Sequence, residues 1–229
     1  MKIEFDNDFW YDKKDDKSRV FQVFPSVFGD DRGTFTEIWK CETTTIPENM
    51  KEIPWFADNM WIKQLNVSHS RPGVIRGCHA QTGNACQGKL VQSMFGNIWD
   101  VITDARPQSD TFMMTKVFFL NPRLQNKVFV PRGFLHAFIT GNELPNGTNY
   151  IFSYICDAVY DKTSEICVSP LNIVIPAFYD YCERYGLENF VKNGTTPLTS
   201  PKDEKGQDPD VFFEVIGNEY KNSSTLWYK

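Results

Sequence analysis

Hydrophobic and polar residues alternate in short runs through the middle of the chain. Runs rich in β-branched and aromatic side chains occur at MWIKQLNVS, KLVQSMFGNIWDVITD, FMMTKVFFLN, NKVFVPRGFLHAFIT and NYIFSYICDAVY. Glycine, proline or asparagine separates these runs at close intervals, a pattern typical of half-buried strands joined by turns. The pattern therefore predicts a mainly β chain, folded as an antiparallel sandwich or barrel.

The two ends of the chain have a different pattern. Residues 1–19 contain the charge cluster YDKKDDKSR, which indicates a solvated arm. After Pro176, AFYDYCERYGLENFVKNG spaces its apolar residues as a helix does and ends on Asn-Gly at 193–194, a suitable C-cap. TTPLTSPKDEKGQDPD then reads as a polar loop, and the tail VFFEVIGNEYKNSSTLWYK is aromatic enough to pack on the rest. We expect a β domain at 20–176, followed at 177–229 by a helical segment, a loop and a packed tail.

Composition and charge narrow the class of protein. The 229 residues are 41% hydrophobic and 23% charged, which is the composition of a globular chain and excludes general disorder. The net charge is -5 and the lysines and arginines are scattered, so nucleic acid is not an expected partner. A small phosphorylated ligand needs only a few cations in one cleft and stays open. No apolar run is long enough to cross a bilayer, so no membrane association is expected.

The cysteines indicate the redox environment. Six are present without a CxxC pair, and no charged-then-apolar leader precedes the β runs. We therefore expect reduced thiols and a cytoplasmic location.

One of only three histidines, His79, lies in GVIRGCHAQ. Imidazole titrates near neutrality, so His79 is a candidate proton acceptor, although a histidine on a strand is more often structural. Arg76 would project from the opposite face of a regular strand, unless Gly77 introduces a bulge. Its guanidinium suits a diphosphate better than an ammonium does, and the ordinary alternative is a surface ion pair.

Other candidates lie on neighbouring strands. Lys89 begins an otherwise apolar run, and His136 enters an aromatic strand after the turn in VPRGFLHAF. Tyr154 and Tyr160 are six residues apart and would share one face of a regular strand. The ordinary alternatives are a solvated strand end and an aromatic core pair. Two histidines on separate strands can converge on a metal ion, but the chain has no HxH motif, so a metal site is disfavoured.

Seven segments occur in one order between about residue 20 and residue 203: DDRGTFTEIW, QLNVSHS, GVIRGCHAQ, GKLVQSMFGNIWDVITDAR, VPRGFLHAF, YICDAVY and LTSPKD. Each is a weak motif alone, but together they resemble the dTDP-4-dehydrorhamnose 3,5-epimerase family. The resemblance implies a cupin-like jelly roll (a double-stranded β-helix) with short C-terminal helices. It also implies a homodimer that acts on a nucleotide-diphosphate sugar, dTDP-linked by preference, with no metal or redox cofactor.

The resemblance also implies roles for single residues. His79 matches the catalytic base, Asp203 the aspartate that pairs with it, Tyr154 the proton donor, and Lys89 the lysine near the C4 oxygen of the sugar. Asp100 matches an acidic residue often found within the barrel. Positions that match substrate contacts are Arg32, Glu37, Gln64, Asn66, Arg76, His136, Tyr160, Glu165 and Lys202.

The chemistry that these roles imply is consistent with the side chains. A ketone at C4 acidifies the hydrogens on C3 and C5, because the carbanion is delocalised onto the carbonyl oxygen. A base on one face of the ring and an acid on the other invert the carbon between them. The sequence thus predicts epimerisation at C3, C5 or both of a nucleotide-linked 4-keto-6-deoxy sugar, in deoxysugar and polysaccharide biosynthesis.

Departures from the family pattern keep alternatives open. Cys78 and Ala80 replace a bulky apolar residue and an aromatic one, Ala137 replaces a glycine, and the stretch between Glu165 and Lys202 is longer than usual. The sugar and the number of inverted centres therefore stay open. A nucleotide-sugar 3,4-ketoisomerase would move the ketone to C3, and a non-catalytic sugar-binding jelly roll would need no opposed acid and base. A metal-dependent cupin oxygenase is the least favoured alternative.

Overall fold

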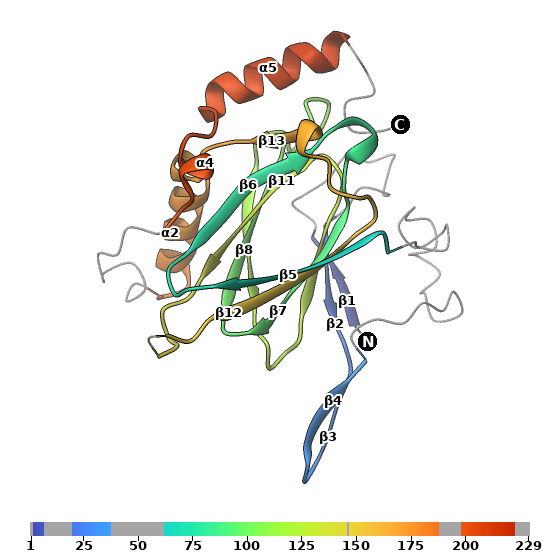
Figure 1. Cartoon of the computed structure of the whole chain (residues 1–229), viewed down its shortest axis with the longest axis vertical. Coiled ribbons are helices and arrows are strands. Elements are labelled where there is room, and N and C mark those ends of the chain that lie inside the picture. Colours follow the sequence, from blue (N-terminus) through green and yellow to red (C-terminus); the bar gives the residue numbers. More distant parts are fainter. Residues whose placement is uncertain (1, 7–19, 38–61, 146, 188–197, 223–229) are drawn as a thin grey trace.

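Two antiparallel β-sheets form the body of the protein. The computed structural model, shown in Figure 1, describes residues 2–6, 20–37, 62–145, 147–187 and 198–222. The six-stranded sheet has the order β1 (Lys2–Phe5), β2 (Phe21–Phe24), β10 (Lys127–Val130), β7 (Lys89–Phe95), β12 (Tyr150–Cys156) and β5 (Gln64–Ser70). The five-stranded sheet has the order β13 (Glu165–Cys167), β6 (Ile75–Gln81), β11 (Phe134–Thr140), β8 (Ile98–Asp104) and β9 (Thr115–Leu120). The predicted mainly β jelly roll is confirmed.

Burial along the strands follows the sequence pattern. Every residue of β8 is buried, since one face packs toward the other sheet and the opposite face packs under helices. In β5, which lies at the edge of its sheet, Leu65 and Val67 are exposed and alternate with half-buried polar residues. A central strand that is covered on both faces buries every residue, whereas an edge strand with one face in solvent buries only alternate residues.

A separate hairpin extends away from both sheets, at the bottom of Figure 1. It consists of β3 (Val27–Asp30) and β4 (Gly33–Thr36), which pair only with each other among the described strands. Its aromatic side chains are uncovered, Phe28 being 61% and Phe35 68% exposed.

One of the two longer helices packs on the outer face of the five-stranded sheet, and the other extends past the end of that sheet, at the top of Figure 1. Helices α2 (Val174–Arg184) and α5 (Pro209–Asn222) bury Phe178 and Phe212 in one apolar cluster with Trp99 of β8 (Figure 1). The aromatic tail predicted to pack on the barrel therefore begins with a helix. None of the helices in the described ranges has the length and apolar character that crossing a membrane requires.

The predicted extent of the first C-terminal helix is wrong. Helix α2 ends at Arg184, and Gly186 follows in the left-handed region with φ 69°. The Gly186 N–H donates to the carbonyl of Glu183 and the Leu187 N–H to that of Cys182, which is a Schellman motif. The Asn-Gly pair at 193–194 that we expected as the cap lies outside the described residues.

The predicted polar loop also contains regular structure. A short helix, α4 (Pro201–Glu204), interrupts it, and α5 begins at Pro209 before the loop was expected to end. At the other end of the chain, the predicted solvated arm at 1–19 is wrong for its first residues, because β1 pairs with β2 and packs Ile3 and Phe5 against the core, whereas residues 7–19 lie outside the described part.

Candidate active site

A β-bulge at Gly77 decides which way Arg76 points. In the pairing of β6 with β11, His79 lies opposite His136 and Arg76 lies opposite Phe138, so β6 has one extra residue. Gly77 has φ 106°, and a Cβ there would lie 2.5 Å from the carbonyl oxygen of His136, so only glycine fits. The extra residue turns Arg76 to the side of His79, as we expected if Gly77 introduced a bulge.

The bulge borders a cavity between the two sheets. Its volume is about 500 Å³, which is the size of a small-molecule site. Side chains from both sheets and from α4 line it. Those predicted from the sequence are Arg76, His79, Lys89, His136, Tyr154, Lys202 and Asp203.

Asp203 reaches His79 because α4 begins where it does. Ser200 caps the helix by accepting a hydrogen bond from the Asp203 N–H at 3.1 Å, and Pro201 occupies the first helical position. The Asp203 carboxylate then lies with Oδ1 2.8 Å from Nε2 of His79, while the Gly77 N–H donates to Oδ2 at 3.3 Å. Burial opposes the charge on Asp203, but the contacts with His79 and Gly77 hold the pKa of this carboxyl below its ordinary value.

Two isolated β-bridges fix the segment that carries α4. Before the helix, Leu198 accepts from the Ile75 N–H and donates to Gly73 O, both at 2.8 Å. After it, Gln207 accepts from the Ser169 N–H at 3.1 Å. Because both ends are tied to the five-stranded sheet, Asp203 is held against β6 rather than on a free loop.

A second carboxylate lies on the other side of the His79 ring. Glu165 on β13 has Oε1 3.6 Å from Nδ1 of His79, and its other oxygen accepts from the Tyr160 hydroxyl at 3.0 Å. Lys202 also donates to Glu165. Burial would raise the pKa of Glu165, but Lys202 and His79 together lower it. The imidazole thus lies between two acidic side chains.

Tyr154 and Lys89 face His79 from the opposite sheet. Tyr154 pairs with Val91 in the register of β12 and β7, and Lys89 is two positions from Val91, so all three share the inner face. Burial raises the pKa of Tyr154, so its phenol is protonated at neutral pH. A candidate base and a candidate acid therefore occupy opposite walls of one cavity.

His136 forms a second histidine–aspartate pair in the same cavity. Its Nε2 lies 2.6 Å from Oδ1 of Asp100, which projects from β8 into the interior. The rings of Phe152 and Tyr154 lie 6.1 and 6.5 Å from the imidazole, centroid to centroid. This pair is packed among aromatic rings.

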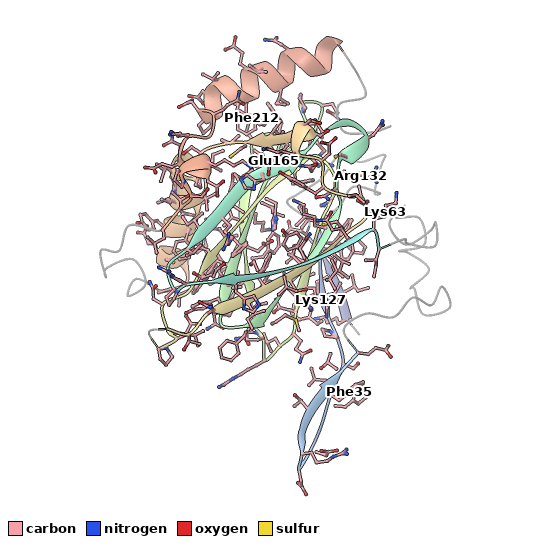
Figure 2. The ribbon with its side chains drawn as sticks, in the orientation of Figure 1. Phe35, Lys63, Lys127, Arg132, Glu165 and Phe212 are labelled. Atoms are coloured by element: carbon pink, nitrogen blue, oxygen red, sulfur yellow. The ribbon has the colours of Figure 1, made fainter. Side chains whose placement is uncertain are left out.

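The remaining predicted residues divide into two groups. Gln64 and Asn66 are hydrogen-bonded to each other at 2.9 Å, and Gln64 Oε1 accepts from the Tyr160 N–H at 2.7 Å, so these three adjoin the site. Arg32 and Glu37 are not brought to the cavity. Arg32 is exposed at the hairpin tip and paired with Asp30, and Figure 2 shows Phe35 of the hairpin and Glu165 of the site at opposite ends of the molecule.

Three features of the site were not predicted. Ser68 lines the cavity, and its spacing from Gln64 and Asn66 on one strand face was a signal that could have identified it. Ser200 also lines it, and Ser-Pro before Lys-Asp is a helix-start pattern. Cys167 pairs with His79 across β13 and β6, and no feature of the sequence indicated this register.

The departures from the family pattern at Cys78 and Ala80 lie away from the cavity. Both are buried in the cluster under α2 and α5, on the face of β6 opposite to His79. Burial raises the pKa of the Cys78 thiol far above its ordinary value. The small side chains at these positions therefore accommodate the helix layer and do not contact a ligand in the cavity.

The chain is similar to known proteins in both sequence and fold. The family model described as dTDP-4-dehydrorhamnose 3,5-epimerase matches residues 17–208. The protein of that name from Escherichia coli K12 is 31% identical over 188 residues, covering 81% of this chain and 87% of the relative. The one from Shigella flexneri is 34% identical over 195 residues, covering 82% and 91%. The crystal structure of the Bacillus anthracis protein of that name, with TDP and PPi bound, superposes with a TM-score of 0.66 and 27% identity, covering 90% of this chain and 99% of the other.

Proposed function

This chain belongs to the dTDP-4-dehydrorhamnose 3,5-epimerase family, and we propose that it inverts C3, C5 or both of a dTDP-linked 4-keto-6-deoxy sugar. It is accordingly an isomerase of deoxysugar and polysaccharide biosynthesis. The observation that carries the proposal is the opposition of His79 on β6 and Tyr154 on β12 across one cavity. Inversion at carbon needs this arrangement, since the proton must leave one face of the ring and return to the other.

In the first step, His79 removes the proton next to the ketone. With the ring N–H of Nε2 donated to Asp203, the lone pair on Nδ1 is free to accept a proton. Asp203 fixes this tautomer, and with Glu165 it stabilises the imidazolium that forms. General base catalysis of this kind contributes about 10²- to 10⁴-fold in rate.

In the second step, Tyr154 gives a proton to the opposite face of the same carbon. Between the two steps the negative charge rests on the C4 oxygen, where the ammonium of Lys89 stabilises it. One well-placed donor contributes about 3–4 kcal/mol in comparable oxyanion sites. Arg76, at the edge of the cavity, is suited to the diphosphate. All these steps are proton transfers driven by the substrate's own ketone, so the mechanism calls for no metal or redox cofactor.

The test follows deuterium from heavy water into the sugar. The protein is incubated with a panel of nucleotide-linked 4-keto-6-deoxy sugars, and NMR locates the label and the configuration at C3 and C5. His79→Ala is expected to lose label uptake by about 10²-fold or more. Tyr154→Phe is expected to retain uptake from the face that His79 serves and to lose inversion.

Other results would contradict the proposal. Uptake that persists in a folded His79→Ala variant, checked by circular dichroism, would exclude His79 as the base. A product with its ketone at C3 would indicate a ketoisomerase. Binding of the nucleotide sugar without any exchange by the wild-type protein would indicate a sugar-binding role.

The proposal includes a homodimer in the cytoplasm. The exposed Phe28 and Phe35 of the hairpin and the open edge of β5 are surfaces that a second subunit would cover. In this dimer each hairpin, with Arg32 at its tip and Glu37 directly after it, extends toward the partner's cavity, which accounts for the absence of both residues from the lining of their own. Light scattering that finds only monomer would contradict it. Free thiols at Cys78, Cys86, Cys156, Cys167 and Cys182 support the cytoplasmic location.

A further inference from the structure

Cys167 has no part in the proton transfers, yet it lies beside the proposed base. Strand β13 pairs antiparallel with β6 so that Cys167 is opposite His79, and cross-strand partners project to the same side of a sheet. Asp203 reaches the same point from α4. A ring nitrogen of His79, the Sγ of Cys167 and a carboxylate oxygen of Asp203 all lie within 4.8 Å of one another.

We propose that His79, Cys167 and Asp203 form a binding site for a thiophilic divalent cation, Zn²⁺ being the best fit. Thiolate, imidazole and carboxylate are the ligands that Zn²⁺ takes in proteins, with three protein ligands and one open position in non-structural sites. A thiolate disfavours Mg²⁺ and Ca²⁺, which take oxygen ligands.

The separations are close to those that a tetrahedral ion imposes. Zinc–nitrogen and zinc–oxygen bonds are about 2.0 Å, which puts two such ligands about 3.3 Å apart. The Nε2–Oδ1 distance of 2.8 Å between His79 and Asp203 therefore needs to open by about half an ångström. Because His79 and Asp203 also line the cavity, the open coordination position faces it.

Glu165 supplies the outer-shell partner that histidine ligands of zinc usually have. With Nε2 bound to the metal, the ring proton resides on Nδ1, and Oε1 of Glu165 lies 3.6 Å from that nitrogen. A carboxylate in this place orients the ring and increases the affinity for the metal. Lys202 and Tyr160 hold Glu165 in position.

Occupation of this site stops the proton chemistry, a consequence that rests on the proposed function. The metal takes the Nε2 lone pair and leaves the proton on Nδ1, so His79 has no free lone pair with which to act as a base. The Cys167 thiol releases its proton to solvent when the metal binds. Zinc is thus an inhibitor of this enzyme and not its cofactor.

The test measures metal binding first, without substrate. Chelator-treated protein is titrated with Zn²⁺ by calorimetry and with Co²⁺ by absorption, since a cobalt–thiolate bond has a charge-transfer band in the near ultraviolet. One Zn²⁺ per chain and the cobalt–thiolate band are expected. Cys167→Ala should remove the band and weaken Zn²⁺ binding by more than about 100-fold, because losing a ligand exceeds the effect of losing an outer-shell partner.

Two further variants distinguish the loss of a direct metal ligand from a general loss of metal binding. Cys182→Ala, at a buried cysteine of α2, should bind both metals as the wild type does. Glu165→Gln should weaken Zn²⁺ binding by about tenfold. Wild-type protein that binds no stoichiometric Zn²⁺, or Cys167→Ala that binds it as tightly as the wild type, would overturn the site.

Deuterium exchange then tests the inhibition. Zn²⁺ should suppress exchange in the wild type and leave Cys167→Ala active, since this residue is outside the proton machinery. Exchange that continues with the site filled would overturn the inhibition. If the metal binds as described but the metal-free protein catalyses no exchange, the proposed function fails and the metal site stands.

Discussion

Both histidines that line the cavity pair with an aspartate, and the two pairs are alike in geometry but differ in access. His79 and His136 are cross-strand partners on β6 and β11, and each places Nε2 against an aspartate, at 2.8 and 2.6 Å. The side chain of His79 is 28% exposed, whereas that of His136 is 8% exposed and packed among aromatic rings. Only the first pair leaves the imidazole open enough to exchange a proton with a ligand.

The two aspartates also differ in how they are held. Asp203 uses both oxygens, one for His79 and one for the N–H of the bulged Gly77. Asp100 uses Oδ1 for His136, and its Oδ2 has no hydrogen-bond partner among the described residues. The pairing of histidine with aspartate therefore does not define a base. The exposure and hydrogen bonding around the pair determine whether its histidine can exchange a proton with a ligand or only holds a side chain in position.

The largest effect is expected from Asp203→Asn. The amide no longer selects the His79 tautomer or stabilises imidazolium, so the rate of deuterium exchange should fall by about 10³- to 10⁴-fold. The free energy of unfolding should also fall by about 1–3 kcal/mol, because both carboxylate oxygens accept hydrogen bonds and the amide NH2 would face one of the two donors. The measurement is exchange by NMR, with urea unfolding beside it. Asp180→Asn, at an exposed residue of α2, is the control and should leave both quantities unchanged. A rate within tenfold of wild type would remove the distinction between the pairs.

Asp100→Asn should have a smaller effect on both quantities. This carboxylate is fully buried and uses only Oδ1, so the amide oxygen can keep the bond to His136 while its NH2 takes the place of the unpaired Oδ2, and the free energy of unfolding should change by no more than about 1 kcal/mol. The exchange rate of the folded variant should fall less than that of Asp203→Asn. Urea titration measures the free energy of unfolding, and NMR measures the rate of deuterium exchange. A greater loss of rate here than at Asp203 would make His136 the base.

The next prediction concerns how the free energy of unfolding depends on pH, a dependence to which a buried lysine outside both pairs contributes. Lys127, labelled in Figure 2, is 2% exposed, and burial lowers its pKa to about 8. Below pH 8 both folded and unfolded states carry the charge, so burial destabilises the fold. Between pH 8 and 10.5 the folded state releases the proton first, so stability rises with pH by about 1 kcal/mol per unit.

Lys127→Met should remove this rise. Unfolding free energies of the two proteins at a series of pH values between 7 and 10 provide the comparison, since shared contributions from cysteines and tyrosines cancel in the difference. Parallel curves would mean that the amine of Lys127 stays solvated.

The part of the fold that the sequence predicted is the part governed by local pattern. Alternation of apolar and polar residues identified the strands, and Gly77 beside Arg76 identified the one position where a bulge would change which side chains share a face. The helix α2 was predicted too long because apolar spacing continues past Tyr185, whereas Gly186 already provides the left-handed residue that ends it. The glycine that ends the helix therefore had more influence than the apolar spacing that continues beyond it.

The parts of the site that the sequence could not predict depend on contacts between distant segments. Cys167 reaches His79 through the register of the three-residue strand β13, which no pattern of so few residues specifies. Arg32 and Glu37 match the family pattern, but neither lines the cavity of its own chain, and Arg32 lies at the exposed tip of the hairpin. A match to a family motif suggests a role for a residue, but whether that residue lies near the cavity depends on the tertiary structure.

The two bridges that hold α4 also determine when the site exists during synthesis of the chain. All strands of both sheets precede residue 168, so a nascent chain can complete the barrel, with His79 and Tyr154 in place, before Asp203 has been made. Until the segment between Leu198 and Gln207 has left the ribosome and docked, the imidazole lacks the partner that selects its tautomer. Completion of the proposed catalytic site is therefore a late event, separate in time from formation of the sheets that surround it.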